Sequence, residues 1–336
     1  MYQENIYYYI VVFYVNSKSY KRPQFTLIND MRVETILFPT PPYDFELSFS
    51  FLGPNCPDPV ARFEKGVYQR LWPLDEERSA FVSIMSIGTL TDPRLKLTLE
   101  GENLSDNDVN RCKNHVADTL CLDLDLEAFY DTVKKDRLLH DHCRKNIGLK
   151  PVLEPTLFEA LTWAIIGQQV NLRFACQVKR GMLEQFAKRK TIDGHIFYQY
   201  PEPAELANLN PLTWRQFKCS TRKAEYVIGL AKQVQDGFDL GGLTRLSDEK
   251  IIEKLVQIRG IGRWTAEYVL IQGFGRWDAL PTGDAGLLNG FKQVYGLDRK
   301  PTEEELREQA ELWRPYRGLS TYYLWWGKQF ERRTNA

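Results

Sequence analysis

Two short helical patterns separated by a Gly-Ile-Gly turn dominate the sequence between Leu255 and Asp284. Apolar residues recur at helical spacing before and after the turn, at Ile251, Ile252, Leu255 and Ile258 and again at Trp264, Tyr268, Val269 and Ile271. Glycine tolerates a positive φ and lets another backbone come close, so a turn at Gly260 and Gly262 can direct the free amides of the second helix at a phosphate.

The local pattern leaves two other interpretations of the turn. An ordinary helix-to-helix connection is as compatible with the glycines as a phosphate-binding hairpin. A dinucleotide-binding loop is disfavoured, because Thr265 stands where a third glycine is needed and the preceding segment is patterned as a helix, whereas that motif follows a strand.

Further motifs follow one another along the chain. They are PPYDF (41–45), FEALTWAIIGQQVNL (158–172), RKAEYVIGLA (222–231), PTGDAGL (281–287) and WRPYRGLSTYYLWW (313–326). With the Gly-Ile-Gly turn, their order and spacing make the chain resemble the helix-hairpin-helix DNA glycosylases and, within them, the DNA-3-methyladenine glycosylase II (AlkA-type) enzymes. The separation of Gly262 from Asp284 also fits this family, in which a catalytic aspartate follows the hairpin.

The patterning predicts an α+β protein with a change of character near Asp125. Before it, the apolar runs FELSFSFL, AFVSIMSIG and LKLTLEG predict strands, while FEKGVYQRLW carries an ambiguous helical signal. After it the chain is almost wholly helical, with capping boxes predicted at Thr156 with Glu159 and at Thr302 with Glu305.

We therefore expect an N-terminal antiparallel-sheet α/β domain over 38–125, followed by two mainly α-helical domains. The first spans 157–276 and contains the helix-hairpin-helix motif. The second combines 126–156 with 277–336 and, by resemblance, completes the cleft. Residues 1–37 are expected to be an extension of unknown role. Their apolar run Ile6–Val15 is too short to span a bilayer and lacks the features of a signal peptide.

The charge of the chain is balanced, with 44 basic and 44 acidic residues. A protein that bound DNA mainly through long-range attraction would usually be basic, so any DNA-binding face has to be local. The run Lys179–Lys190 and the C-terminal Lys328, Arg332 and Arg333 are candidates, each of which equally suits a solvated surface.

The six cysteines form no CxxC pair and predict reduced thiols in a cytosolic protein. Some members of the superfamily hold an iron-sulfur cluster with four closely spaced C-terminal cysteines; here no cysteine follows Cys219, so no cluster is expected. A metal site at His140, His142 and Cys143 is disfavoured, because histidines two apart diverge on a helix.

The resemblance implies that Asp284 is the catalytic residue. Its place before the apolar run AGLLNGF equally suits a helix N-cap. Cleavage of an N-glycosidic bond leaves positive charge on the sugar, which a nearby carboxylate stabilises while it orients water. Bifunctional members carry a lysine nucleophile just after the hairpin, where this chain has Trp264, so a monofunctional hydrolase is expected.

Trp264 and Tyr268 lie four apart and share one helix face, and Trp325 matches the family's C-terminal cleft tryptophan. The resemblance implies that these three form an aromatic pocket for a base rotated out of the duplex. Such a pocket favours cationic N-alkylated purines. For Tyr322, Tyr323 and Trp326 a role in the core is preferred.

The resemblance also implies the contacts with DNA. The expected DNA-binding residues are Gly260, Ile261, Gly262, Arg263, Thr265, Gln168 and Gln169. One of the two glutamines would fill the gap left by the flipped base, where the best-known member has a leucine. Backbone carbonyls of Val256, Ile258 and Ile261 are expected to hold a monovalent cation, Na+ or K+, and no other cofactor is expected.

Together these features predict a monofunctional glycosylase of base excision repair that flips alkylated bases, of the 3-methyladenine and 7-methylguanine type, and excises them hydrolytically to leave an abasic site. Its expected partner is damaged double-stranded DNA, and we expect a monomer in the bacterial cytoplasm, associated with the nucleoid and not with a membrane. The alternatives are a glycosylase for oxidised or mismatched bases and a non-catalytic helix-hairpin-helix DNA-binding protein.

Overall fold

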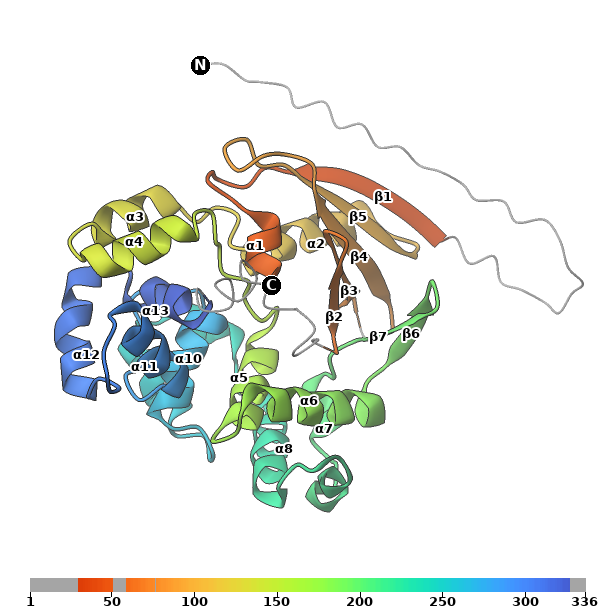
Figure 1. The fold of residues 1–336 in the computed structure, drawn as a ribbon. Coiled ribbons are helices and arrows are strands. Elements are labelled where there is room, and N and C mark those ends of the chain that lie inside the picture. The colour runs from red at the N-terminus through yellow and green to blue at the C-terminus, as the bar shows by residue number, and fades with distance from the viewer. Residues whose placement is uncertain (1–29, 51–58, 76, 327–336) are drawn as a thin grey trace, which may run out of the picture.

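The computed structural model describes residues 30–50, 59–75 and 77–326, which form an N-terminal antiparallel sheet and a larger helical part (Figure 1). The strands of the main sheet lie in the order β1-β5-β4-β3-β2. They are β1 (Asp30–Leu37), β2 (Ala61–Glu64), β3 (Val67–Pro73), β4 (Ser79–Ser86) and β5 (Leu95–Glu102). Leu95, Leu97 and Leu99 are fully buried in a core that also takes in helix α2 (Asp106–Thr119).

Strand β1 belongs to the sheet, so the sheet domain begins at Asp30 and not at residue 38 as expected. Its eight residues pair with β5 from Asp30 opposite Glu102 to Leu37 opposite Leu95. Within the extension expected over 1–37, for which an extra strand was one alternative, Asp30–Leu37 forms an edge strand, so the sheet domain begins before residue 38. The run Ile6–Val15 lies outside the described residues.

The predicted strand FELSFSFL is wrong, since helix α1 (Phe45–Phe49) occupies its first part. The side chain of Asp44 accepts the Leu47 amide at 2.9 Å and caps the helix. Phe45 and Phe49, four residues apart, meet with ring centroids 4.8 Å apart. The run FEKGVYQRLW, whose signal was ambiguous, forms the β2–β3 hairpin. The other two runs are β4 and β5, as predicted.

The helical part begins after Asp125. Its helices are α3 (Leu126–Val133), α4 (Arg137–Lys145), α5 (Leu157–Gly167), α6 (Leu172–Phe186), α7 (Pro203–Leu206), α8 (Thr221–Gln235), α9 (Asp248–Leu255), α10 (Arg263–Gln272), α11 (Ala285–Val294), α12 (Glu303–Ala310) and α13 (Arg317–Trp326), with 3-10 turns η2 (Pro211–Phe217), η3 (Gly241–Arg245) and η4 (Glu311–Trp313). None of these helices combines the length and the apolar character that crossing a bilayer requires.

A β-hairpin interrupts the helical part, which was expected to be almost wholly helical. It consists of β6 (Arg189–Ile192) and β7 (His195–Tyr198), and a positive φ at both Asp193 and Gly194 forms its two-residue turn. Phe197 on β7 packs edge-on against Phe81 on β4, with centroids 4.8 Å apart. The hairpin thus connects the helical part to the sheet.

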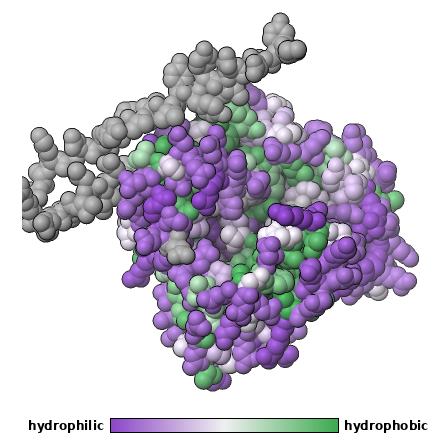
Figure 2. All heavy atoms as spheres, turned by 180° about the vertical axis from the view of Figure 1, so that it is seen from behind, coloured by the Kyte–Doolittle hydropathy of each residue, from purple (hydrophilic) through white to green (hydrophobic). Residues whose placement is uncertain are grey.

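Two hydrophobic cores organise the helices. One contains α5, α6 and α8–α10. The other combines residues between Leu126 and Leu149 with residues between Leu280 and Leu324, so segments far apart in the sequence share one core. In Figure 1, α3 and α4 accordingly lie on the same side of the molecule as α11 and α12. Seen from behind, the surface is mostly hydrophilic, with apolar side chains in a few separate patches (Figure 2).

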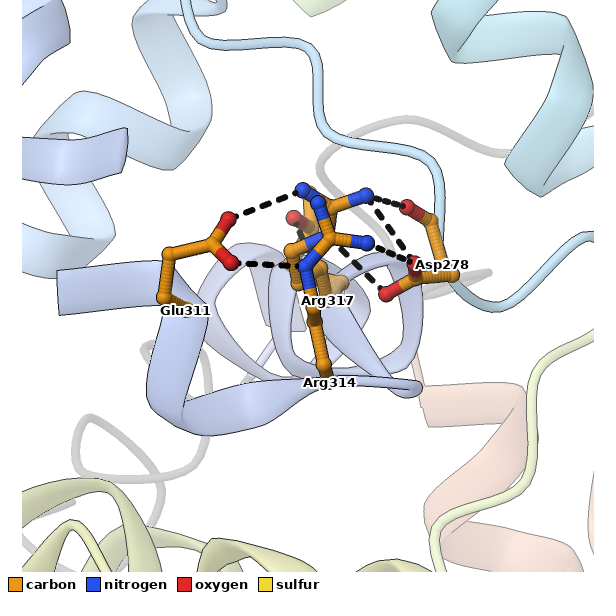
Figure 3. Close-up of polar contacts among 5 residues, drawn as sticks. Asp278, Glu311, Arg314 and Arg317 are labelled. Atoms are coloured by element: carbon orange, nitrogen blue, oxygen red, sulfur yellow. Dashed lines mark hydrogen bonds and ion pairs between the residues drawn. The ribbon is translucent and has the colours of Figure 1, made fainter. Parts of the chain in front are cut away.

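An ionic cluster attaches α13 to the loop that follows α10 (Figure 3). Arg317 donates from Nε and Nη2 to the two carboxylate oxygens of Asp278 and from Nη2 to its carbonyl, each at 2.9 Å. Arg314 reaches the same carboxylate at 2.9 Å, and Glu311 accepts from both arginines. This cluster fixes the start of α13, whose last turn carries Trp325, relative to the chain that leads to Asp284.

We predict that Asp278→Ala lowers the free energy of unfolding by about 1–3 kcal/mol, because it leaves the half-buried guanidinium of Arg317 without its bidentate acceptor. Asp131→Ala is the matched control: its pair with Lys134 is exposed, and its loss should cost at most about 0.5 kcal/mol. Urea unfolding followed by circular dichroism measures both. Equal losses in the two variants would contradict the structural role of Asp278.

Candidate active site

The turn between α9 and α10 places its two glycines in different environments. Gly260 has φ +95°, and a Cβ there would lie 2.2 Å from the Tyr226 ring. Gly262 has φ −95°, and a Cβ there would meet no atom within 4 Å. Gly260 is therefore required by the fold of the turn, whereas Gly262 keeps the surface in front of α10 open.

The start of α10 presents free amides. Its N-cap, Gly262, supplies no side-chain acceptor. The exposed Arg259 and Arg263 flank the turn, where they pair with Glu225 at 3.3 Å and Glu267 at 2.8 Å. A positive helix terminus beside two exposed guanidinium groups is chemically suited to an anion.

Two of the expected DNA-binding side chains point into the protein. Ile261 and Thr265 are buried, so only their backbone groups are available at the turn. The Thr265 hydroxyl accepts a hydrogen bond from Gln168 Nε2 at 3.0 Å, and the same Nε2 donates to the Gly260 carbonyl at 2.8 Å. Gln168 thus holds the hairpin, whereas Gln169 is exposed and has φ +54°.

Asp284 lies in the loop before α11 and is almost completely buried. Its Oδ1 accepts the Leu287 amide and the Trp325 indole N–H, both at 2.7 Å, and its Oδ2 accepts the Trp264 indole N–H at 3.0 Å. All three donors are neutral, so they orient the carboxylate and leave its charge uncancelled. Asp284 is also the N-cap of α11, as the alternative interpretation predicted. The capping bond uses Oδ1, and Oδ2 accepts from the Trp264 indole.

Gly286 allows this arrangement. A Cβ on Gly286 would lie 3.0 Å from Asp284 Oδ1 and 3.1 Å from Trp325 Cδ1. Nothing in the sequence signalled this requirement, because the contact joins α11 to α13 across the loop.

The three expected pocket aromatics form a continuous row of rings tilted by 31° and 43° to one another, which we call the aromatic stack. The ring centroids of Trp264 and Tyr268 are 5.7 Å apart, and those of Tyr268 and Trp325 are 5.5 Å apart. The Tyr268 hydroxyl accepts the indole N–H of Trp163 at 3.1 Å, a partner that the sequence did not indicate. Tyr322 and Tyr323 are fully buried, which confirms their core role; the side chain of Trp326 lies outside the described residues.

The structure also describes some of the residues considered for a basic DNA-binding face or a metal site. Lys179 is buried, so it cannot belong to a basic DNA face, and Lys328, Arg332 and Arg333 lie outside the described residues. His142 Nε2 hydrogen-bonds the Tyr323 carbonyl at 3.1 Å. No three metal-binding side chains gather within the described part of the chain.

The cysteines differ in state. Cys112, Cys121, Cys143 and Cys219 are buried free thiols. Cys176 is disulfide-bonded, so the expectation that every thiol is reduced is wrong there, and Cys56 lies outside the described residues.

The carbonyls expected to bind a monovalent cation lie around the turn after α9. The Ile258 carbonyl accepts the Ile261 amide at 3.0 Å and keeps its second lone pair. A set of neutral carbonyl oxygens suits a hard cation of low charge, so the residues present are compatible with the expected Na+ or K+.

Comparison with known proteins decides the family. The model of the HhH-GPD superfamily base excision DNA repair proteins matches residues 162–315. A DNA-3-methyladenine glycosylase of Bacillus subtilis (strain 168) is 36% identical over 205 residues, which cover 61% of this chain and 68% of that protein. The chain belongs to the HhH-GPD superfamily.

Two further comparisons agree with this assignment. DNA-3-methyladenine glycosylase 1 of Schizosaccharomyces pombe is 31% identical over 170 residues, 50% of this chain and 71% of that protein. The solved 3-methyladenine DNA-glycosylase of Archaeoglobus fulgidus superposes with a TM-score of 0.76 at 24% identity and covers 88% of this chain and 98% of that one. The predicted α+β architecture of this HhH-GPD protein is thereby confirmed.

The two hairpin glycines give a paired prediction. Gly260→Ala should lower the free energy of unfolding by about 2 kcal/mol or more, because the left-handed φ and the Tyr226 ring both oppose a Cβ. Gly262→Val should fold normally and bind abasic duplex about tenfold more weakly, since its side chain would block a phosphate from the amides. Thermal unfolding and a binding titration separate the two effects. Unweakened binding by folded Gly262→Val would reduce the hairpin to a turn.

Proposed function

We propose that this protein is a monofunctional DNA glycosylase that removes alkylated purines, of the 3-methyladenine and 7-methylguanine type, from double-stranded DNA and leaves an abasic site. The observation that carries the proposal is the nearly buried Asp284 carboxylate, oriented by two indole N–H groups at the edge of an aromatic stack. The names of the two relatives that are more than 30% identical support the substrate class.

The chemistry requires one carboxylate. When the C1′–N bond breaks, its electron pair leaves with the base, and the positive charge that develops on the sugar is stabilised by Asp284. The oxygen of a water molecule then bonds to C1′, and its proton passes to the carboxylate or to solvent. An alkylated purine is already cationic, so it leaves without a general acid.

Trp264 supports a hydrolytic mechanism without lyase activity. Its indole N–H donates to Asp284 and its ring lies on Tyr268, so this position can supply no amine to attack C1′. The strand is left intact, and the abasic product passes to an enzyme that cleaves it.

The proposed DNA contacts divide by role. The amides of the hairpin and the start of α10 hold a phosphate, with Arg259 and Arg263 beside them. Gln169, exposed between α5 and α6, fills the gap left by the flipped base and hydrogen-bonds the orphaned partner. Gln168 acts indirectly by holding the hairpin. Carbonyls of Val256, Ile258 and Ile261 would hold a monovalent cation there, and the enzyme would act as a monomer on chromosomal DNA in the cytoplasm.

Asp284→Asn tests the catalytic assignment. The amide keeps the size of the side chain and loses its charge, so single-turnover excision of 7-methylguanine should fall by about 10²–10³-fold while binding of abasic duplex persists. Asp298→Asn, which neutralises an exposed carboxylate in the same helical part, is the control and should leave the rate unchanged. Retention of more than about a tenth of the wild-type rate by Asp284→Asn would exclude this role.

Borohydride trapping tests the mechanism. Because residue 264 is a tryptophan, which has no amine to form a Schiff base, incubation with substrate duplex and sodium borohydride should give no covalent protein–DNA complex. Electrophoresis under denaturing conditions detects such a complex, and a bifunctional glycosylase serves as positive control. A trapped species would place the protein in the lyase class.

A further inference from the structure

A buried ionic cluster lies between the sheet and the helical part, and the proposed reaction does not use it. It consists of Arg70 on β3, Glu154 in the segment before α5, Glu159 on α5 and Lys179 on α6. Arg70 Nη2 is 2.5 Å from Glu159 Oε2, and Lys179 Nζ is 3.3 Å from Glu159 Oε1 and 3.9 Å from Glu154 Oε2. Three of these side chains are at most 5% exposed, and that of Glu154 is 18% exposed.

These four described side chains contribute two positive and two negative groups, which balance one another. The neighbouring His115 adds no charge, because burial, reinforced by Arg70, lowers its pKa to about 4 and keeps the imidazole neutral at pH 7. Glu159 was expected to complete a capping box with Thr156. Thr156 does accept the Glu159 amide at 3.0 Å, but the Glu159 carboxylate is directed into this cluster.

The cluster lies directly behind the aromatic stack. Lys179 Nζ is 5.2 Å from the centroid of the Trp163 ring, and the indole N–H of Trp163 donates to the Tyr268 hydroxyl. Tyr268 is the middle ring of the stack formed with Trp264 and Trp325. One indole therefore separates the ammonium group from the ring against which a flipped base would stack.

Glu154 and Lys179 shift the pKa of Tyr268 in opposite directions. Burial raises the pKa of Tyr268 above its ordinary range, the Glu154 carboxylate raises it further, and the Lys179 ammonium opposes this rise. In an environment with little water, charges at this range interact more strongly than they would in bulk solvent.

We infer that this buried cluster sets the preference of the pocket for cationic over neutral bases, with Glu154 as the specificity-determining carboxylate and Lys179 as its counter-charge. The inference rests on the proposed function. In the intact cluster Glu154 and Glu159 offset the positive charges of Lys179 and Arg70. Removing the charge of Glu154 leaves the pocket backed by excess positive charge, which opposes a cationic base, and removing that of Lys179 leaves excess negative charge, which favours one.

The two charge removals should therefore act in opposite directions. For wild type, Glu154→Gln and Lys179→Met, the single-turnover rate constants are measured for excision of 7-methylguanine, which is cationic, and hypoxanthine, which is neutral. The ratio of the two rate constants should fall about three- to tenfold in Glu154→Gln and rise by a similar factor in Lys179→Met. Glu184→Gln, on the exposed face of α6, is the control and should leave the ratio unchanged.

The ratio distinguishes specificity from support of the fold. A cluster that only held the sheet against the helices would slow both excisions together in both variants, and an unchanged ratio or a shift in the same direction would overturn the inference. If circular dichroism shows that Lys179→Met does not fold, the ratio measured for Glu154→Gln alone tests the inference. That substitution keeps the size of a partly exposed side chain, so the variant should fold. Absence of 7-methylguanine excision by the wild type would overturn the proposed function, and this inference with it.

Discussion

The arrangement of the candidate site depends on the hydrogen bonds that hold the Asp284 carboxylate. One donor is an amide at the start of α11, and the other two are indoles from α10 and α13. The carboxylate therefore joins three helices, and its orientation requires that all three be correctly placed. The Asp278–Arg317 contacts hold α13 in position, and Gly286 allows the close approach of Trp325.

A helix cap and a catalytic carboxylate are compatible in one residue. The capping bond uses Oδ1, which limits the rotation of the side chain, and the second oxygen has only the Trp264 indole as donor. Neutral donors hold the carboxylate in a fixed orientation before the substrate binds. The side chain therefore needs little reorganisation during the reaction. The burial of this carboxylate beside aromatic rings lowers the local dielectric and strengthens the effect of its charge.

The sheet domain takes part in the site through the buried ions. Arg70 comes from β3, yet its partner Glu159 also contacts Lys179, which lies over the Trp163 ring behind Tyr268. Buried ion pairs contribute little net stability compared with apolar packing of the same volume. The role that we infer for these buried ions is instead to set the electrostatic potential at the aromatic stack. Through Arg70, the N-terminal sheet then takes part in the selection of substrate.

Asp284 and Trp325 were indicated by the resemblance to a known family. The sequence by itself determined the hairpin, the helix face that Trp264 and Tyr268 share, and the cap at Thr302. These depend on short-range rules: glycine conformation, helical spacing and capping act within a few residues. Only the tertiary structure decided that FELSFSFL begins as a helix, that Gln168 holds the hairpin while Gln169 is exposed, and that Lys179 and Glu159 are buried together. Each of these outcomes depends on partners far away in the chain, such as Gly260 for Gln168 and Arg70 for Glu159. Local patterns carry no information about such partners, because burial is decided by which distant segments pack together.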